Sequence, residues 1–296
     1  MSYKNICGDN ALTFLTKLYM AQTEVNESSS NHIVDIAQKL IAGGVELNHR
    51  NDFEGHKRHM GSGLSDRDAK RIAQAVVTAG LSRIDHMIIT HYHADHVGGV
   101  PPLLKLIQVR NFYDHGPNTE TTNARTQQMF DDYVKLAGTK RTILTPGDKL
   151  SLGSIDLSIV AAAGKVMNGR LDRGFFTTYC DSPEQKPADT TENSQSVGFL
   201  LTYNKFSFLD LGDLTWDREL QLACPINKIG EVTLFQATHH GFSNGQSGNP
   251  ALINSLKPQV VVVNNGGRKG FSNGGYDGIK AIPGLQAIWQ GHTGES

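Results

Sequence analysis

The 296-residue sequence has no surplus charge of either sign and only three cysteines. Its 28 Lys and Arg residues balance 29 Asp and Glu residues, so it lacks the positive surplus typical of a dedicated nucleic-acid-binding protein. The cysteines (Cys7, Cys180 and Cys224) are far apart and in no metal-binding spacing. We therefore expect them to be free, because a chain of this length can bury a core large enough to fold without disulfides.

The sequence also lacks an apolar run of the roughly 18–20 residues that a membrane-spanning helix requires. The apolar stretch at 11–21 is interrupted by Thr13, Thr16 and Lys17 and has no basic lead-in. This pattern predicts a short helix rather than a signal peptide. By default we expect a cytoplasmic protein without a membrane segment.

Short apolar runs separated by turn residues predict strands that alternate with helices from residue 65 onward. Two β-rich halves, each followed by helices and joined without a linker, predict one α/β domain built in layers. Residues 1–64 are mostly polar and lack a clear period, so we expect an irregular segment there and the main domain at 65–296. The predicted strands lie at 84–89, 109–113, 141–144, 154–162, 174–180, 196–203, 206–211, 232–237, 259–264 and 285–289. The predicted helices lie at 65–80, 101–107, 121–136, 215–224 and 250–256.

Histidines are concentrated directly after the strand predicted at 84–89. His91 and His93 are two residues apart in extended backbone, so their imidazoles project from one side and can chelate one divalent ion. Asp95 and His96 follow as the chain turns, which directs their side chains to a neighbouring point. The spacing therefore predicts ligands for two adjacent metal ions, and this mixture of imidazole and carboxylate suits zinc.

Two later segments offer further ligands at the ends of predicted strands. Asp213 follows an apolar strand and a glycine, and its carboxylate could bridge two cations or cap the next helix. His239 and His240 follow the strand predicted at 232–237. We favour His239 as the metal ligand and His240 as a donor to a substrate oxyanion, while the exchanged assignment stays open.

The run His91-x-His93-x-Asp95-His96 after an apolar strand resembles the signature of the metallo-β-lactamase-fold hydrolases. The segment ending in Gly212-Asp213 and the later His-His-Gly run resemble two further motifs of that family. The resemblance implies a four-layered αββα sandwich of the α/β class and a metal-dependent hydrolase. It also implies two zinc ions, with manganese as the alternative, and Asp213 between them.

The run Glu192 to Ser196, taken with His-His-Gly, is most similar to one branch of that family. This branch contains the hydrolase domain of the competence DNA-uptake channel and the phosphorylcholine esterases. Two departures stand out. Asn193 takes the place of a ligand histidine common in the family, which implies weaker binding of the ion at His91 and His93. Residues 33–63 show only fragments of the family's first strands, which implies a remodelled front segment.

The resemblance implies that a metal-bound hydroxide attacks an ester or phosphodiester bond. Asp95 would orient or deprotonate the water, and His240 would assist as a catalytic group. The candidate substrate contacts are Asn193, His115 and Arg268. His115 also fits a structural role in its loop, and Arg268 also fits an exposed cation in a turn. The expected partner is a small molecule or a phosphodiester, and the charge balance does not favour nucleic acid. A nuclease acting on DNA or RNA and a non-catalytic binding module that retains the fold are the alternatives.

Overall fold

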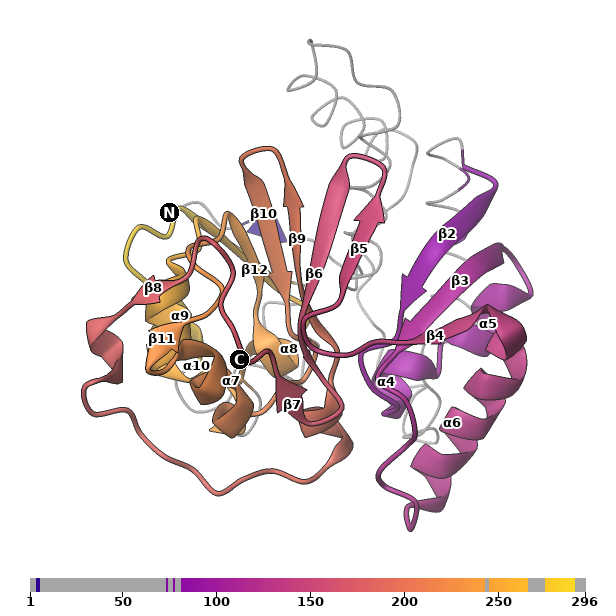
Figure 1. Cartoon of the computed structure of the whole chain (residues 1–296). Helices are drawn as coiled ribbons and strands as arrows, with labels where there is room; N and C mark the ends of the chain where they lie inside the picture. The colour runs from indigo at the N-terminus through magenta and orange to yellow at the C-terminus, as the bar shows by residue number, and fades with distance from the viewer. Residues whose placement is uncertain are drawn as a thin grey trace.

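The computed structural model describes residues 4–5, 73, 77, 81–242, 245–265 and 275–290. In this part of the chain, two β-sheets pack face to face, with helices on the outer side of each (Figure 1). Of the segment 1–64, only the backbone of β1 (Lys4–Asn5) is described, where it pairs in parallel with the last strand of the larger sheet. The rest of the irregular segment predicted there lies outside the described residues.

The smaller sheet is parallel and carries its own helices. Its strands are β2 (Arg83–Ile88), β3 (Gln108–Asp114) and β4 (Arg141–Ile143), with α5 (Val100–Leu104) and α6 (Ala124–Ala137) on the outer side. Side chains alternate between the two faces of a strand. Phe112 accordingly packs with Tyr133 of α6, whereas the next residue, Tyr113, faces the second sheet. This alternation explains why β3 is buried on both sides.

The larger sheet has nine strands among the described residues, and most pair with neighbours in the order β1-β14-β13-β12-β10-β9-β6-β5, with β7 added beside β6. Strands β9 and β10 form a hairpin in which Tyr203 pairs with Phe206, in agreement with the strands predicted at 196–203 and 206–211. The bounds are β5 Lys149–Leu152, β6 Ile155–Ala162, β7 Lys165–Val166, β9 Gly198–Tyr203, β10 Phe206–Asp210, β12 Leu234–Gln236, β13 Val260–Val263 and β14 Ala287–Gln290.

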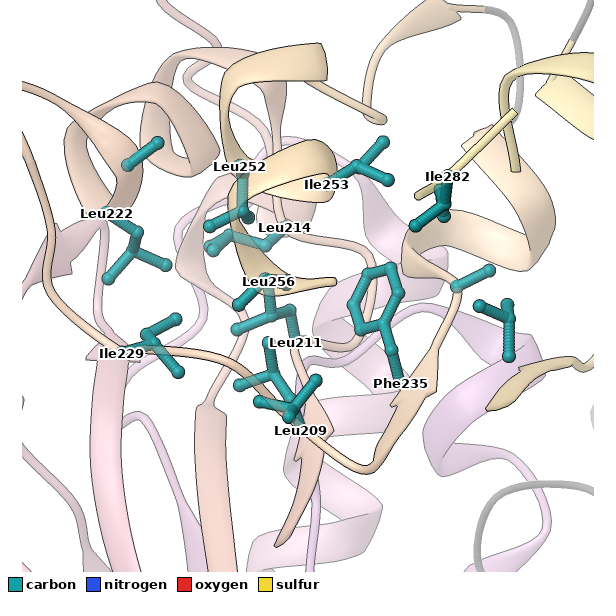
Figure 2. Packing of buried hydrophobic residues seen from close by; sticks show 14 of the residues in the cluster. Leu209, Leu211, Leu214, Leu222, Ile229, Phe235, Leu252, Ile253, Leu256 and Ile282 are labelled. Carbon is teal, nitrogen blue, oxygen red and sulfur yellow. The ribbon is translucent and has the colours of Figure 1, made fainter. Parts of the chain in front are cut away.

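Three hydrophobic clusters separate four layers. One holds the small sheet to α5 and α6, and a second lies between the sheets, where Phe199 and Phe208 meet residues such as Tyr113. In the third, Leu209 and Phe235 pack against the helices on the far side of the large sheet (Figure 2). These helices are α7 (Trp216–Ala223), α9 (Pro250–Leu256) and α10 (Gly275–Lys280). The layers confirm the predicted αββα sandwich.

Two local features differ from the predictions. The strand predicted at 174–180 is reduced to β8 (Phe175–Phe176), which pairs with β11 (Ile226–Asn227), and a 3₁₀ turn, η3 (Thr178–Cys180), follows it. The Thr177 side chain accepts a hydrogen bond from the Tyr179 N–H, and such local bonds compete with strand pairing. Between the strand predicted at 84–89 and the helix predicted at 101–107, where no regular element is predicted, the chain forms the short helix α4 (Ala94–Val97).

The prediction of free cysteines is wrong for two of the three. Cys180 and Cys224 form a disulfide between η3 and the end of α7, with their Cα atoms 5.5 Å apart. A separation of 44 residues along the chain carries no signal for this contact, because only the fold brings the two segments together. Cys7 lies outside the described residues. Within the described part of the chain, no helix has the length and apolar character needed to cross a membrane.

Candidate metal centre

The loops that follow β2, β10 and β12 meet at one end of the sandwich, near α4 and α8 in Figure 1. The His239 N–H donates a hydrogen bond to the Gly212 carbonyl at 3.0 Å, which joins the loops after β12 and β10. The Val197 N–H, directly before β9, donates to the Thr90 carbonyl at 2.9 Å in the loop after β2. The carboxyl ends of strands are where α/β sheets generally place their ligand sites. Residues from distant parts of the chain are thereby brought to one place.

The turn that presents Asp213 depends on glycine. Gly212 has a φ of +57°, and a Cβ on it would lie 2.8 Å from the Cβ of Thr90. Asp210, at the end of β10, accepts a hydrogen bond from the Gly212 N–H at 2.8 Å. These contacts direct the buried carboxylate of the next residue, Asp213, toward the histidine loop.

The segment labelled α8 (Thr238–Phe242) is irregular at the two histidines. His239 and His240 have φ values of 52° and 59°, in the left-handed region that non-glycine residues rarely adopt. Such strain persists only where the surrounding structure imposes it, and it is common at functional sites. Both side chains are buried, so the strained turn directs two imidazoles into the interior.

Four imidazoles surround one carboxylate oxygen. Measured from Oδ2 of Asp213, the Nε2 atoms lie at 3.2 Å for His96, 3.5 Å for His240, 3.6 Å for His239 and 3.9 Å for His91. The fold thus gathers four of the predicted histidines around the predicted bridging aspartate, although well over a hundred positions separate some of them in the sequence.

His93 and Asp95 contact different members of this cluster. Nδ1 of His93 is 3.1 Å from Nε2 of His91, so both nitrogens face the same point. Oδ2 of Asp95 is 3.2 Å from Nε2 of His240 and 3.8 Å from Nε2 of His96. The Asp95 side chain is 43% exposed, which leaves it accessible from solvent.

The donor atoms fit divalent metal ions. Among the described residues, two groups of potential ligands each have all their donor atoms within 4.8 Å of one another: His91, His96 and Asp213, and Asp95, His96 and His240. Imidazole nitrogen with carboxylate oxygen is a donor set that zinc accepts. His239 is absent from both groups, whereas His240 is present in one.

Burial and neighbouring charge set the protonation of the central residues. Burial lowers the pKa of His91 well below its usual range, and the neighbouring His96 lowers it further. Burial alone would raise the pKa of Asp213, but His96 and His240 outweigh it and hold that pKa well below its usual range. A neutral imidazole and an ionised carboxylate are the forms that bind metal.

Sequence reasoning missed the side chains that support these residues. Oγ of Ser196 lies 3.3 Å from Nδ1 of His91 and accepts a hydrogen bond from the Asp213 N–H at 3.3 Å. Glu120 lies 3.2 Å from Nε2 of His93. Ser196 stood in a motif used only for the family resemblance, and no local pattern singled out Glu120.

Two of the three predicted substrate contacts, Asn193 and His115, lie among the described residues, and both are buried. Asn193, in the 3₁₀ turn η4 (Glu192–Gln195), is 8% exposed, and its Oδ1 is buried without a hydrogen-bond partner among the described residues. His115 is 2% exposed, and its Nε2 lies 3.0 Å from the buried carboxylate of Glu192. Arg268 lies outside the described residues.

Glu219 is a buried carboxylate that holds the segment directly before α9. Its carboxylate is fully buried on α7 and accepts hydrogen bonds from the Gly248 and Asn249 N–H groups at 2.7 and 2.8 Å. Burial raises the pKa of Glu219 to about 7 despite these bonds.

The raised pKa of Glu219 predicts a pH-dependent stability. The folded protein keeps this proton up to about pH 7, whereas the unfolded chain releases it near the ordinary pKa of 4.5, so stability falls as the pH rises between these values. The difference corresponds to at most about 3 kcal/mol. We expect Glu219→Gln to reduce this fall, as measured by urea unfolding at pH 4.5 and pH 7.5, and the contribution of buried Asp210, whose pKa burial raises to about 6, to remain.

The exposed Glu231 offers a matched control, because Glu231→Gln should keep the pH dependence of the native protein. An unchanged pH dependence in Glu219→Gln would contradict this account of the buried carboxyl group.

Residues 62–156, about a third of the chain, match the model of the Metallo-beta-lactamase superfamily. The chain is 32% identical over 101 residues to the hydroxyacylglutathione hydrolase of Rhodopseudomonas palustris (strain ATCC BAA-98 / CGA009), which covers 33% of this chain and 40% of that protein. It is also 32% identical over 117 residues to the hydroxyacylglutathione hydrolase of Nitrobacter winogradskyi, covering 38% of this chain and 45% of that protein. The chain thus spans less than half the length of these curated relatives.

Among solved structures, the metallo-beta-lactamase fold protein YhfI from Bacillus subtilis is 10% identical with a TM-score of 0.40, covering 71% of this chain and 76% of that one. The diiron beta-hydroxylase CmlA from Streptomyces venezuelae is 15% identical with a TM-score of 0.42, covering 70% of this chain and 44% of that one. The family match and the observed layers confirm the predicted metallo-β-lactamase fold. The relatives named as hydrolases support the predicted enzyme class, a metal-dependent hydrolase.

Proposed function

We propose that this chain is a metal-dependent hydrolase that cleaves an ester or phosphodiester bond at the cluster around Asp213. The observation that carries the proposal is the convergence of four imidazole Nε2 atoms within 3.9 Å of one buried carboxylate oxygen. A merely structural role would not require so many titratable groups around one anion, and metal sites in proteins have this composition.

We assign the ligands to two neighbouring ions, with zinc as the first choice and manganese as the alternative. His91 and His93 would hold one ion, and Asp95, His96 and His240 would hold the other. Asp213 would supply a carboxylate to the same centre. The distances support His240 rather than the initially favoured His239, since His240 faces both Asp95 and Asp213. In this assignment His239 contacts Asp213 without binding an ion.

The ion assigned to His91 and His93 has no third histidine ligand. Asn193 occupies the sequence position where related enzymes commonly have that histidine. An amide oxygen is a weaker zinc ligand than an imidazole nitrogen, so this ion exchanges more readily. Bound divalent ions would lower the pKa of a water molecule and polarise the bond to be cleaved. Asp95, whose carboxylate is accessible, would accept the proton of the attacking water.

A phosphodiester of the kind expected for the competence-protein and phosphorylcholine esterase branch is the first substrate class to test. The Glu192 to Ser196 run and the His-His-Gly turn support this choice. A nucleic acid strand and pure binding without turnover are alternatives that the same experiment separates. The curated relatives favour a second candidate, hydrolysis of a hydroxyacylglutathione.

The test is a panel of bis(p-nitrophenyl) phosphate, p-nitrophenyl phosphorylcholine, single-stranded DNA and a hydroxyacylglutathione. We expect turnover of at least one of them, loss of that turnover after treatment with a chelator, and recovery when zinc or manganese is added back. Metal binding without turnover of any substrate would favour the binding module. Turnover that survives complete metal removal would contradict the proposal.

A further inference from the structure

His93 is held between two partners that require different nitrogens. Its Nδ1 faces Nε2 of His91 at 3.1 Å, and its Nε2 faces Oε1 of Glu120 at 3.2 Å. A carboxylate can only accept a hydrogen bond, so the contact with Glu120 favours the tautomer that carries its proton on Nε2. In that tautomer the lone pair is on Nδ1, directed at the point that His91 also faces.

Glu120 is itself fixed by hydrogen bonds from three neighbours. Its Oε1 accepts a hydrogen bond from the Glu192 N–H at 3.1 Å, and its Oε2 accepts from the Thr126 hydroxyl at 3.2 Å and the Asn123 amide at 3.3 Å. The side chain is only 20% exposed. A carboxylate that is held on both oxygens is oriented before any ligand binds.

These contacts also join the two sides of the first ion's proposed site. The Glu192 N–H that binds Glu120 belongs to the turn carrying Asn193, and the Glu192 carboxylate accepts a hydrogen bond from the Tyr92 N–H at 3.3 Å. The segment with His91 and His93 is thus tied to the segment with Asn193. Glu120 lies where the two segments meet.

We propose that Glu120 is a positioning residue that sets the tautomer and orientation of His93 so that Nδ1 binds the first metal ion. This inference rests on the proposed function for the presence of the ion, but the tautomer is a property of the chain itself. Carboxylates that hold the outer nitrogen of a ligand histidine commonly change metal affinity by about 10- to 100-fold when removed.

The test compares Glu120→Ala with the native protein and with Glu184→Gln, a substitution of a glutamate that is 63% exposed. In metal-free protein labelled with ¹⁵N-histidine, we expect His93 to be protonated on Nε2 in the native protein and in Glu184→Gln. In Glu120→Ala we expect a mixture of tautomers. If Glu120→Ala does not fold, Glu120→Gln takes its place, because it keeps the side-chain volume but loses the charge. In Glu120→Gln we expect a smaller change of the His93 tautomer population in the same direction.

Zinc affinity, measured by competition with a chromogenic chelator, gives the second readout. We expect Glu120→Ala to weaken the more loosely bound zinc about 10- to 100-fold. In a His93→Ala background, the same substitution should have no further effect. A folded Glu120 variant with an unchanged His93 tautomer and unchanged zinc affinity would overturn the proposal. Lack of hydrolysis by a protein that binds zinc and shows these shifts would contradict the proposed function while leaving the role of Glu120 intact.

Discussion

Asp213→Asn is expected to abolish most of the hydrolytic activity, with a loss in kcat/KM on the order of 10³-fold or more. The side chain lies at the centre of the cluster, with four imidazole nitrogens within 3.9 Å of its Oδ2. Asparagine has the same shape but cannot supply the negative charge that compensates two cations. Steady-state kinetics and elemental analysis of the dialysed variant would show lower activity together with lower metal content.

The control for this substitution is Asp156→Asn, on an exposed position of β6. It removes an equal charge from an exposed strand position and should change neither activity nor metal content. An Asp213→Asn variant that keeps native metal content and activity would show that the cluster is not the reactive centre.

The second large loss of activity is expected on substitution of His240, and it distinguishes this residue from its neighbour His239. Nε2 of His240 lies near Asp95 and Asp213, and its Nδ1 is 3.1 Å from the Asn264 carbonyl oxygen, the arrangement of a ligand histidine held by a backbone acceptor. His239 lies outside both groups of potential ligands. We expect His240→Ala to lower kcat/KM on the order of 10²- to 10³-fold and to lose about one metal equivalent.

His239→Ala is the matched comparison, because it removes the same side chain from the neighbouring position of the same strained turn. It should lower the activity no more than about tenfold and keep the metal content. The reverse ranking, with metal lost only in His239→Ala, would restore the assignment that the sequence alone favoured.

The sequence predicted best what is encoded by neighbouring residues. The strand before His91, the strand predicted at 109–113 and the two-residue connection between the strands predicted at 196–203 and 206–211 follow from local periodicity and turn chemistry. The layered fold could be predicted because such strands and helices must bury their apolar faces against one another. The His91 to His96 run was recognisable because its potential ligands lie within six residues.

What the sequence did not predict depends on contacts between distant segments. Glu120 is 27 residues from His93, and Ser196 is 105 residues from His91, so no spacing rule connects them. The disulfide between Cys180 and Cys224 was missed for the same reason. The proposed preference for His240 over His239 rests on a strained backbone turn, which local sequence patterns do not reveal.

The most direct test of the metal centre is anomalous X-ray scattering from crystals of the protein equilibrated with zinc, recorded on both sides of the zinc absorption edge. The account predicts an anomalous peak between Asp213, His96 and His240, and a second, weaker peak beside His91 and His93. A zinc-saturated crystal without an anomalous peak at Asp213 would contradict it.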